Sequence, residues 1–538
     1  MLASNSVVKT QAVIGLSVFI IGIWLAMQTG QRIAADDFRS IEFAVMAVAA
    51  CAVALTIVRN WRTGFYMFLT WLLFEDLVRK YLGNNMAIYF AKDILVGLVY
   101  ASFLIEVRRK HLKLFRSAFF PFLWLFVWFG AVQIFNQNSP HLLYGLLGFK
   151  LYFYYIPLMF VSYALIRTDE DLRKFLLVNI SLAGVISAIG IAQAILGHSF
   201  LNPTNLAPEL KDLGELDRTS PITHQVLSLP TAVFVSSGRF GFYILVAVIM
   251  TCGAAAYLLL STSKYHKWVF TVIALVGGAS IFSGSRGSVT FGAASVIILS
   301  IGFMWGAPWR WQQAHRMVKA IRNGILVLAI GFTLIFVIFP EEIAPRIAFY
   351  TESLNPNSDA SEVGNRAWSY PIRNLMGALS EPNWIVGSGI GTASLGGQYV
   401  AKLIGRPPLD IWVEEGYGVL IVEMGIAGPF IWLLWTGALV WCGFTVMRRL
   451  RQTRFFPIAF AMWWYIFVLL FPLTYGGMSA YQNFVTNMYL WLFVGILFRL
   501  PEMQAAVPSY YDDSAVKKPN RRGYMLPQPQ TIPQEQIY

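Results

Sequence analysis

The sequence contains few charged residues, few histidines and almost no cysteine. Charged residues occupy only 13% of the 538 positions, whereas soluble domains carry about 25%, so an ordinary soluble protein is excluded. The three cysteines lie within or at the ends of apolar runs. An odd number in such places argues against a disulfide framework, and no Cys/His spacing typical of a metal site occurs, so we predict neither a metal nor a cofactor.

Apolar residues make up 57% of the chain, and the mean hydropathy is +0.58. Because a membrane-spanning helix needs about 20 apolar residues, we predict an all-α polytopic membrane protein with about fourteen (roughly twelve to fourteen) transmembrane helices within residues 1–500. No cleavage site follows the N-terminal run, which we interpret as the first span and not as a signal peptide. The predicted spans are 11–28, 41–58, 63–78, 86–105, 118–136, 142–166, 174–196, 240–261, 267–283, 287–306, 323–340, 414–443, 455–474 and 484–498.

The net charge of +13 would suggest a nucleic-acid partner in a soluble protein. Here Lys and Arg cluster after every second apolar run, which is the positive-inside pattern, so we expect no nucleic acid. This pattern places both termini in the cytoplasm and two sizeable loops, 197–239 and 341–413, outside. The segment 501–538 is rich in Pro and Gln and has almost no apolar periodicity, which predicts a disordered cytoplasmic tail.

Five ionisable residues lie toward the outer ends of predicted spans. Such groups cost about 2.5–3.5 kcal/mol at the centre of a membrane helix, so each is a candidate for function. A lysine–carboxylate pair neutralised within the bundle, such as Lys92–Asp93, is the structural explanation for Glu75, Asp76, Lys92 and Asp93. Lys150 has no neighbour of opposite charge in the sequence, so a structural and a substrate-binding role are both open for it.

Arg286 lies between two apolar runs, in the segment S283-G-S-R-G-S288. Small neighbours let a ligand approach the backbone and add amide and hydroxyl donors. A guanidinium at headgroup depth can bind a phosphate with two parallel hydrogen bonds. The alternative is an arginine that only anchors a helix end at the membrane surface.

The 341–413 loop is the longest polar stretch between two apolar runs. Residues 362–379 predict a partly amphipathic helix that carries Arg366 and Arg373 toward the same surface as Arg286. Charges on a solvated helix face are the alternative for both arginines. The run G387-S-G-I-G391 is not a phosphate-binding P-loop, because no lysine follows it, and by itself it indicates a tight turn.

Three motifs resemble those of one family. Glu414-Glu415, nine residues and then Gly425-x-x-Gly428 match a motif of bacterial O-antigen ligases, in which a His stands where this chain has Glu414. The segment 283–288 resembles the Ser-Arg-Gly motif of that family. The segments 364–368 and 381–391 resemble its Arg…Trp…Pro-x-x-Gly-x-Gly-x-Gly loop. Over residues 280–430 the chain therefore resembles the O-antigen ligase/polymerase superfamily.

The resemblance implies a GT-C-like glycosyltransferase that needs no metal and works at the periplasmic face of the bacterial inner membrane. It would polymerise or ligate oligosaccharide repeat units carried on undecaprenyl pyrophosphate, most simply as an exopolysaccharide or O-antigen polymerase. Its partners would be that donor, a glycan acceptor, the lipid bilayer, a chain-length regulator and export machinery. The 341–413 loop would be the large periplasmic loop with short helices.

The resemblance also implies residue roles. Arginines would stabilise the pyrophosphate leaving group, and Arg286 and Arg366 are the catalytic candidates. Glu414, with Glu415 beside it, would take the proton of the acceptor hydroxyl. Glu414 in place of the family His favours polymerase-like members. The implied substrate-binding residues are Arg286, Arg366, Arg373, Lys150, Trp368 and Tyr417.

Three alternatives remain open from the sequence. A metal pair formed by Asp410 and Glu414, four residues apart, would place a cation where we expect a base. An O-antigen ligase or a protein O-oligosaccharide ligase would use the same donor with another acceptor. A transporter or flippase for lipid-linked glycans would also need a basic outer cavity, but such proteins often show repeated halves, which this sequence lacks.

Overall fold

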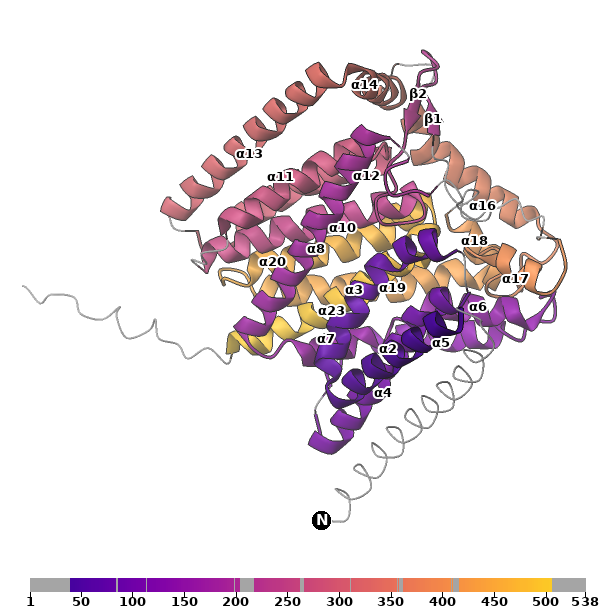
Figure 1. The fold of residues 1–538 in the computed structure, drawn as a ribbon. Coiled ribbons are helices and arrows are strands. Elements are labelled where there is room, and N and C mark those ends of the chain that lie inside the picture. The colour runs from indigo at the N-terminus through magenta and orange to yellow at the C-terminus, as the bar shows by residue number, and fades with distance from the viewer. Residues whose placement is uncertain are drawn as a thin grey trace, which may run out of the picture.

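The structure is a computed structural model that describes residues 39–505 apart from 84–85, 113, 198, 204–216, 262–265, 310, 356, 358–360, 408 and 410–415. Within these ranges the chain is mostly helical (Figure 1), and two short antiparallel strands form a hairpin. The first elements are α2 (Arg39–Arg59), α3 (Trp61–Leu82), α4 (Met86–Lys110), α5 (Phe120–Gln133), α6 (Leu142–Phe153), α7 (Leu158–Leu165), α8 (Asp169–Leu196), β1 (Asp217–Thr219), β2 (Val226–Ser228), α10 (Ser237–Leu260), α11 (His266–Phe282) and α12 (Arg286–Gly306). The remaining elements are α13 (Trp311–Ile338), α14 (Pro340–Leu354), α15 (Glu362–Gly364), η1 (Asn365–Ser369), α16 (Tyr370–Ser380), α17 (Gly397–Leu403), α18 (Gly418–Met424), α19 (Ala427–Arg449), α20 (Phe456–Val468), η2 (Leu469–Leu473), α21 (Thr474–Gly476), α22 (Ser479–Gln482) and α23 (Phe484–Ala505).

Eight helical segments of the described chain are long and apolar enough to cross a membrane. The protein is therefore an all-α, multi-pass membrane protein, as the hydropathy predicts. A ninth crossing arises if α13 and α14, which meet at an angle of 119°, form one broken span. The eight segments are Ala87–Lys110, Leu142–Leu165, Asp169–Leu196, Ser237–Leu260, Arg286–Gly306, Ala427–Arg449, Phe456–Gly476 and Phe484–Ala505.

The predicted count of about fourteen spans is not confirmed. Two of the predicted spans are short helices, because α5 has 14 residues and α11 has 17. The predicted span 63–78 lies within α3, where Glu75, Asp76, Arg79 and Lys80 interrupt the apolar residues. The predicted span 11–28 lies outside the described residues.

The predicted span 414–443 is divided into α18 and α19. The break falls at Gly425, which has a φ of 72° and lies so close to the large loop that an added Cβ would be 2.2 Å from the Ile385 carbonyl oxygen. At the other end of the chain, α23 continues to Ala505, so the first residues of the predicted tail are helical. Residues 506–538 lie outside the described residues.

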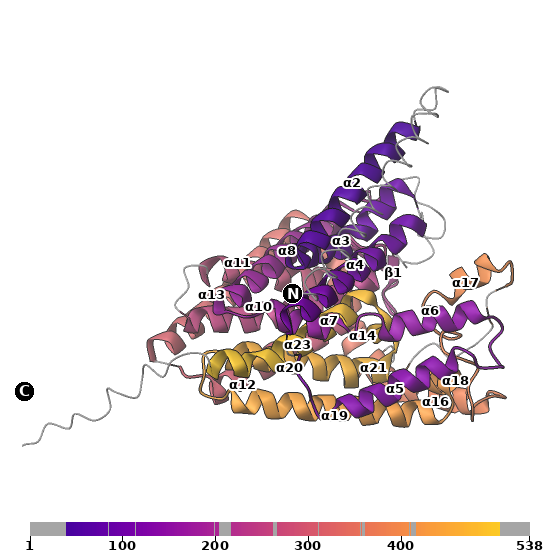
Figure 2. The same cartoon turned by 90° about the horizontal axis from the view of Figure 1, so that it is seen from below.

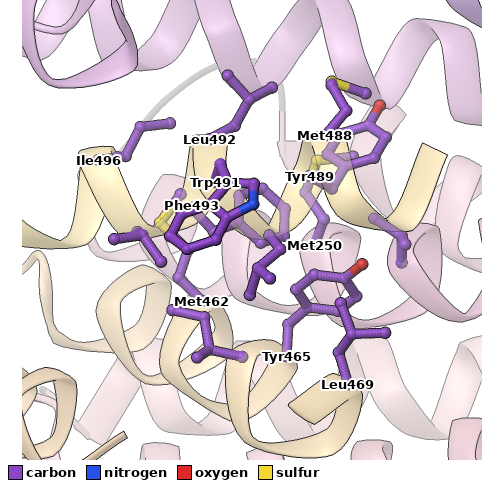
Figure 3. Close-up of a cluster of buried hydrophobic side chains, with 14 of the residues drawn as sticks. Met250, Met462, Tyr465, Leu469, Met488, Tyr489, Trp491, Leu492, Phe493 and Ile496 are labelled. Carbon is purple, nitrogen blue, oxygen red and sulfur yellow. The ribbon is translucent and has the colours of Figure 1, made fainter. Parts of the chain in front are cut away.

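The core of the bundle lies between α10, α20 and α23. Figure 3 shows Met250, Met462, Tyr465, Tyr489 and Trp491 packed there with aliphatic side chains, and all five are at most 1% exposed. The two tyrosine hydroxyls donate to the Thr486 carbonyl and the Asn179 side chain at 2.9 and 2.8 Å, so these buried polar groups are satisfied.

Side chains join the loops at one end of the bundle. The Arg346 guanidinium of α14 donates to the carbonyl oxygens of Phe282, Ser228 and Ala194 at 2.6, 2.9 and 3.3 Å. These acceptors lie at or near the ends of α11, β2 and α8, so the 197–239 and 341–413 loops lie at the same end. Figure 1 shows α14 beside the hairpin, where Glu352 accepts hydrogen bonds from the backbone amides of 222 and 223.

The basic segments meet at the opposite end. Arg62 donates to the Ala164 carbonyl at 3.2 Å, Arg454 pairs with Asp169 at 3.2 Å, and the Arg499 Nε donates to the carbonyl of residue 166 at 3.1 Å. The arginines that follow the second, twelfth and fourteenth predicted spans therefore share one end of the molecule. This separation of basic segments from large loops is the arrangement that the positive-inside pattern predicts for a membrane protein.

Arg346 is the residue whose loss should most loosen the loops. It is 1% exposed, and Arg346→Gln leaves buried carbonyl groups unsatisfied, at about 1–3 kcal/mol for each group that loses its only partner. We expect a lower thermal unfolding midpoint in detergent and faster proteolysis of the 341–413 loop. The matched control is Arg406→Gln, because Arg406 is exposed. Equal midpoints for the two variants would refute this role of Arg346.

Candidate functional site

A cavity of about 570 Å³ lies where both large loops meet the helices, and we call it the central cavity. Its walls come from α3, α4, α6, the start of α10, the loop before α17, and the region of α22 and α23. Cationic, hydroxyl, amide and aromatic side chains all reach it. The lining residues are Arg79, Tyr89, Tyr144, Leu151, Ser236, Gly238, Arg239, Phe242, Thr392, Ala393, Ser394, Leu395, Gly396, Gly397, Gln398, Tyr399, Leu409, Ser479, Gln482, Asn483 and Phe484.

Two arginines of the central cavity share one buried carboxylate. Asp76 is 1% exposed and pairs with Arg79 at 3.0 Å and with Arg239 at 2.7 Å. The Arg239 guanidinium also lies over the ring of Phe484, 4.7 Å from its centroid. One carboxylate therefore holds two guanidinium groups from α3 and α10 in place, and its single charge neutralises only one of them.

More charges lie behind this wall. Lys92 pairs with Glu75 at 2.9 Å, and Lys150 pairs with Asp93 at 2.5 Å. The Lys80 ammonium donates to the Thr231 hydroxyl and the Ala232 carbonyl at 2.8 and 2.9 Å. These eight residues form what we call the charged cluster, which contains five basic and three acidic side chains. The charged cluster consists of Glu75, Asp76, Arg79, Lys80, Lys92, Asp93, Lys150 and Arg239.

The suggested pairing of Lys92 with Asp93 is wrong. Neighbouring residues of a helix point in directions about 100° apart and do not face each other. Lys92 instead faces Glu75 of α3, and Asp93 faces Lys150 of α6. Lys150 therefore has a carboxylate partner that is distant in sequence, and its ammonium also lies 4.8 Å from the centroid of Tyr89, a lining residue.

The glycine run at 387–391 positions the cavity wall that residues 392–399 form. Gly387, Gly389 and Gly391 have φ values of 84°, 96° and 92°, which side chains other than glycine rarely adopt. A Cβ added at Gly391 would lie 2.0 Å from the Tyr144 carbonyl oxygen of α6. The run therefore passes in backbone contact with α6 and delivers residues 392–399 to the central cavity. Figure 2 shows α5, α6, α16, α17 and α18 gathered at this side of the bundle.

Two buried side chains fasten residues 392–395. The Glu423 carboxylate of α18 accepts hydrogen bonds from the Ala393 amide at 3.1 Å and the Ser394 hydroxyl at 2.7 Å. Gln482 accepts from the Leu395 amide at 3.0 Å and donates to the Ser394 oxygen at 3.0 Å. Since Glu423 is fully buried, it acts on the cavity by holding this loop.

One amide offers a donor to the cavity. Asn483 is 5% exposed and lines the central cavity. Its side-chain oxygen accepts from the Val485 amide at 2.9 Å, and its nitrogen donates to no group among the described residues. The cavity lining thus combines two guanidinium groups with a neutral hydrogen-bond donor, which suits an anionic ligand carrying polar groups.

The predicted arginines lie outside the lining of this cavity. Arg286 is the first residue of α12, and its guanidinium lies 5.0 Å from the centroid of Phe349. Arg366 and Arg373 are exposed and lie 4.8 and 4.9 Å from the centroid of the same ring, Tyr370. The structure therefore brings Arg366 and Arg373 together on the surface and does not bring them to Arg79 and Arg239.

The other predicted site residues are dispersed. Trp368 is 69% exposed, and Tyr417 packs edge-on against Tyr475 at 6.1 Å between ring centroids. Glu414, Glu415 and Asp410 lie outside the described residues. Leu409, the last described residue before 410–415, lines the central cavity. Among the described residues, no three His, Cys, Asp or Glu side chains are grouped as a metal site requires.

Sequence reasoning missed Arg79, Arg239 and Glu423. The rule that ionisable groups in apolar helices are candidates for function selects Glu423 in the run V-L-I-V-E-M and Arg79 three residues after Asp76. Arg239 has a weaker signal, because it stands at the start of an apolar run where basic residues commonly occur. Only the fold brings it to Asp76.

The backbone contact of the glycine run can be tested with two matched substitutions. Gly391→Ala places a Cβ 2.0 Å from the Tyr144 carbonyl oxygen and requires a φ of 92°, a strain of about 1–3 kcal/mol from the backbone alone. In Gly397→Ala, the three atoms nearest to the added Cβ are a carbon of the Tyr144 ring at 3.6 Å and two carbonyl oxygens at 3.8 Å, which are ordinary contact distances. We expect the first variant to lower the thermal midpoint in detergent and the second to leave it unchanged. Similar midpoints would contradict the close contact of α6 with the run.

Comparison of the chain with known proteins adds no relative. No family model, curated protein or solved structure matches it. The resemblance to the O-antigen ligase/polymerase superfamily therefore rests on the sequence motifs alone.

Proposed function

We propose that the protein is a metal-independent membrane glycosyltransferase that polymerises or ligates oligosaccharide repeat units carried on undecaprenyl pyrophosphate. The observation that carries the proposal is the central cavity, with Arg79 and Arg239 on one wall and hydroxyl and amide groups on the other. A sugar pyrophosphate carries negatively charged phosphates, which match the arginines. It also carries sugar hydroxyls, which match the hydroxyl and amide groups of the other wall. The sequence motifs at 280–430 support the same class of enzyme.

In the proposed reaction, arginines stabilise the leaving group and a separate carboxylate activates the acceptor. Transfer of the glycan leaves negative charge on a pyrophosphate, which guanidinium groups stabilise through charge-assisted hydrogen bonds in a site of low dielectric. Arg239 is the better placed group, because 22% of its side chain is exposed whereas Arg79 is buried. The acceptor hydroxyl must lose a proton, and Glu414 is the proposed base.

We infer a GT-C-like enzyme of the bacterial inner membrane with both termini in the cytoplasm and the central cavity at the periplasmic face. The basic segments at one end of the bundle and the large loops at the other support this orientation. The product would be an exopolysaccharide or O-antigen chain, and a chain-length regulator and export machinery would be its partners.

Arg239 provides the first test of the proposed function. Arg239→Gln removes a cation from the cavity while Arg79 still neutralises Asp76. We expect loss of polymer by about 10²-fold or more, with normal protein abundance, and incomplete recovery in Arg239→Lys because an ammonium lacks the guanidinium fork. Polymer would be measured as long chains on a gel, with the lipid-linked repeat unit accumulating.

Arg406→Gln is the control for this test, because Arg406 is exposed and does not line the cavity. Arg286→Gln and Arg366→Gln apply the same test to the two arginines that the sequence motifs predict as pyrophosphate ligands. Parental polymer from Arg239→Gln, together with loss in Arg286→Gln or Arg366→Gln, would move the pyrophosphate site away from the central cavity. Parental polymer from all three variants would refute an arginine-assisted transfer.

Glu414 provides the second test. A base must accept a proton, so Glu414→Gln should lower turnover by about 10²–10⁴-fold while the donor still binds. Glu414→His should retain part of the activity, since imidazole accepts protons near neutral pH. If Glu414 only holds a nearby arginine, the ordering reverses, because a charged imidazole repels that arginine. Glu341→Gln, at an exposed position of α14, is the control.

A further inference from the structure

A cavity of about 380 Å³ lies between the last turns of α2 and α4, and we call it the basic cavity. Its volume falls in the range of small-molecule sites, about 300–1,000 Å³. Figure 2 shows α2, α3 and α4 side by side at one edge of the bundle. Since α2 ends at Arg59, close to Arg62 in the chain, the basic cavity lies at the end of the bundle where the basic segments meet. It shares no lining residue with the central cavity.

Two guanidinium groups line the basic cavity. Arg59 is the last residue of α2, and Arg109 lies in the last turn of α4. Both residues are exposed, and neither guanidinium forms an ion pair or a hydrogen bond with any residue that the structure describes. One carboxylate, that of Glu106, also lines the cavity, but the Lys110 ammonium pairs with it at 2.8 Å. The cavity therefore offers two cationic groups to a ligand, which favours an anion.

Side-chain contacts close the basic cavity toward the interior of the bundle. The Ser102 hydroxyl donates to the Val58 carbonyl at 3.2 Å, which joins α4 to α2. The next residue of α4, Phe103, packs edge-on against Trp61 with ring centroids 5.1 Å apart, and both residues are at most 3% exposed. A ligand of this cavity therefore lies at the edge of the bundle, next to the membrane.

The polarity of the basic cavity changes along the helices. Leu55 and Ile105 line it about one turn before Arg59 and Arg109, respectively, so its apolar part points toward the middle of the membrane. Leu104, beside Ile105, is 54% exposed, and α4 is long and apolar enough to cross a membrane. The apolar chains of a lipid can therefore lie along α4 while its head contacts the arginines.

We propose that the basic cavity binds the headgroup of an anionic membrane phospholipid, with its phosphate between Arg59 and Arg109 and its acyl chains along α4. This inference goes beyond the proposed function and does not depend on it. Basic residues at helix ends mark the topology of multi-pass proteins, so charge alone does not make a site. Here the charges line a cavity together with aliphatic side chains, and basic pockets between helices on the cytoplasmic side typically bind phosphate-bearing lipid heads.

Two pairs of neighbouring residues in α4 give matched tests. Arg109→Gln removes a guanidinium that lines the basic cavity, whereas Arg108→Gln removes the same charge from an exposed position that does not line it. Ile105→Trp fills the cavity, whereas Leu104→Trp adds the same side chain outside it. Purified protein in detergent is titrated with dioleoyl phosphatidylglycerol, and binding is followed by native mass spectrometry. We expect Arg109→Gln and Ile105→Trp to weaken binding at least about fivefold and both controls to change it by less than about twofold.

Two further ligands identify the group that the basic cavity recognises. Dioleoyl phosphatidylethanolamine has the same chains and phosphate with an added ammonium, and glycerol 3-phosphate has the phosphate without the chains. We expect phosphatidylethanolamine to bind more weakly than phosphatidylglycerol, because both arginines repel its ammonium. We expect millimolar glycerol 3-phosphate to leave the binding of phosphatidylglycerol unchanged. Displacement of the lipid by glycerol 3-phosphate would indicate a site for a soluble phosphate ester and would overturn the proposal.

Three other outcomes would also overturn the proposal. Equal losses in Arg108→Gln and Arg109→Gln would show that anionic lipid is attracted only by the overall charge of this end of the bundle. Equal binding of phosphatidylethanolamine and phosphatidylglycerol would show no selection for a net negative head. Parental binding of phosphatidylglycerol in Ile105→Trp would show that the lipid does not occupy the cavity. None of these outcomes bears on glycan transfer, because the basic cavity and the central cavity share no lining residue.

Discussion

The structure around the central cavity depends on one carboxylate inside the bundle. Asp76 joins Arg79 of its own helix to Arg239 of α10. Moving an isolated charge into an interior of low dielectric is very costly, and removing one partner of a buried pair commonly costs about 3–5 kcal/mol. Asp76 therefore keeps a cationic partner when either arginine alone is replaced, whereas replacement of Asp76 removes a carboxylate that both guanidinium groups contact. These three residues fix the end of α3 against the start of α10, where the cavity lies.

Basic side chains outnumber acidic side chains in the charged cluster. Five cations of the charged cluster face three carboxylates, and the cluster lies beside the central cavity. An anionic ligand that enters the cavity pairs with the guanidinium groups and makes hydrogen bonds that water would otherwise make. In the proposed function, these cationic groups contribute to the binding of a phosphate-bearing substrate.

The cavity wall opposite the two arginines is held by backbone contact and by buried hydrogen bonds. Residues 392–399 are held by backbone contact of the glycine run with α6 and by hydrogen bonds to Glu423 and Gln482. Loops normally remain at the surface because their backbone groups need partners. Here buried side chains supply those partners, so a loop can form one wall of a site opposite a pair of arginines. Such support gives a site its geometry before a ligand arrives.

The sequence by itself determined the class of the protein and the end of the bundle at which to look. Hydropathy identifies a multi-pass all-α membrane protein, and the alternation of basic segments separates them from the 197–239 and 341–413 loops, because these signals come from local composition. The count of fourteen spans is not confirmed, since apolar length alone does not distinguish a crossing from a shorter packed helix such as α5. The tertiary structure alone decided which charges meet. Arg79 reaches Arg239 through Asp76, and Lys150 reaches Asp93, across separations in sequence that no local pattern records. An ion pair requires only that two side chains be close in space, and that proximity arises when the helices pack.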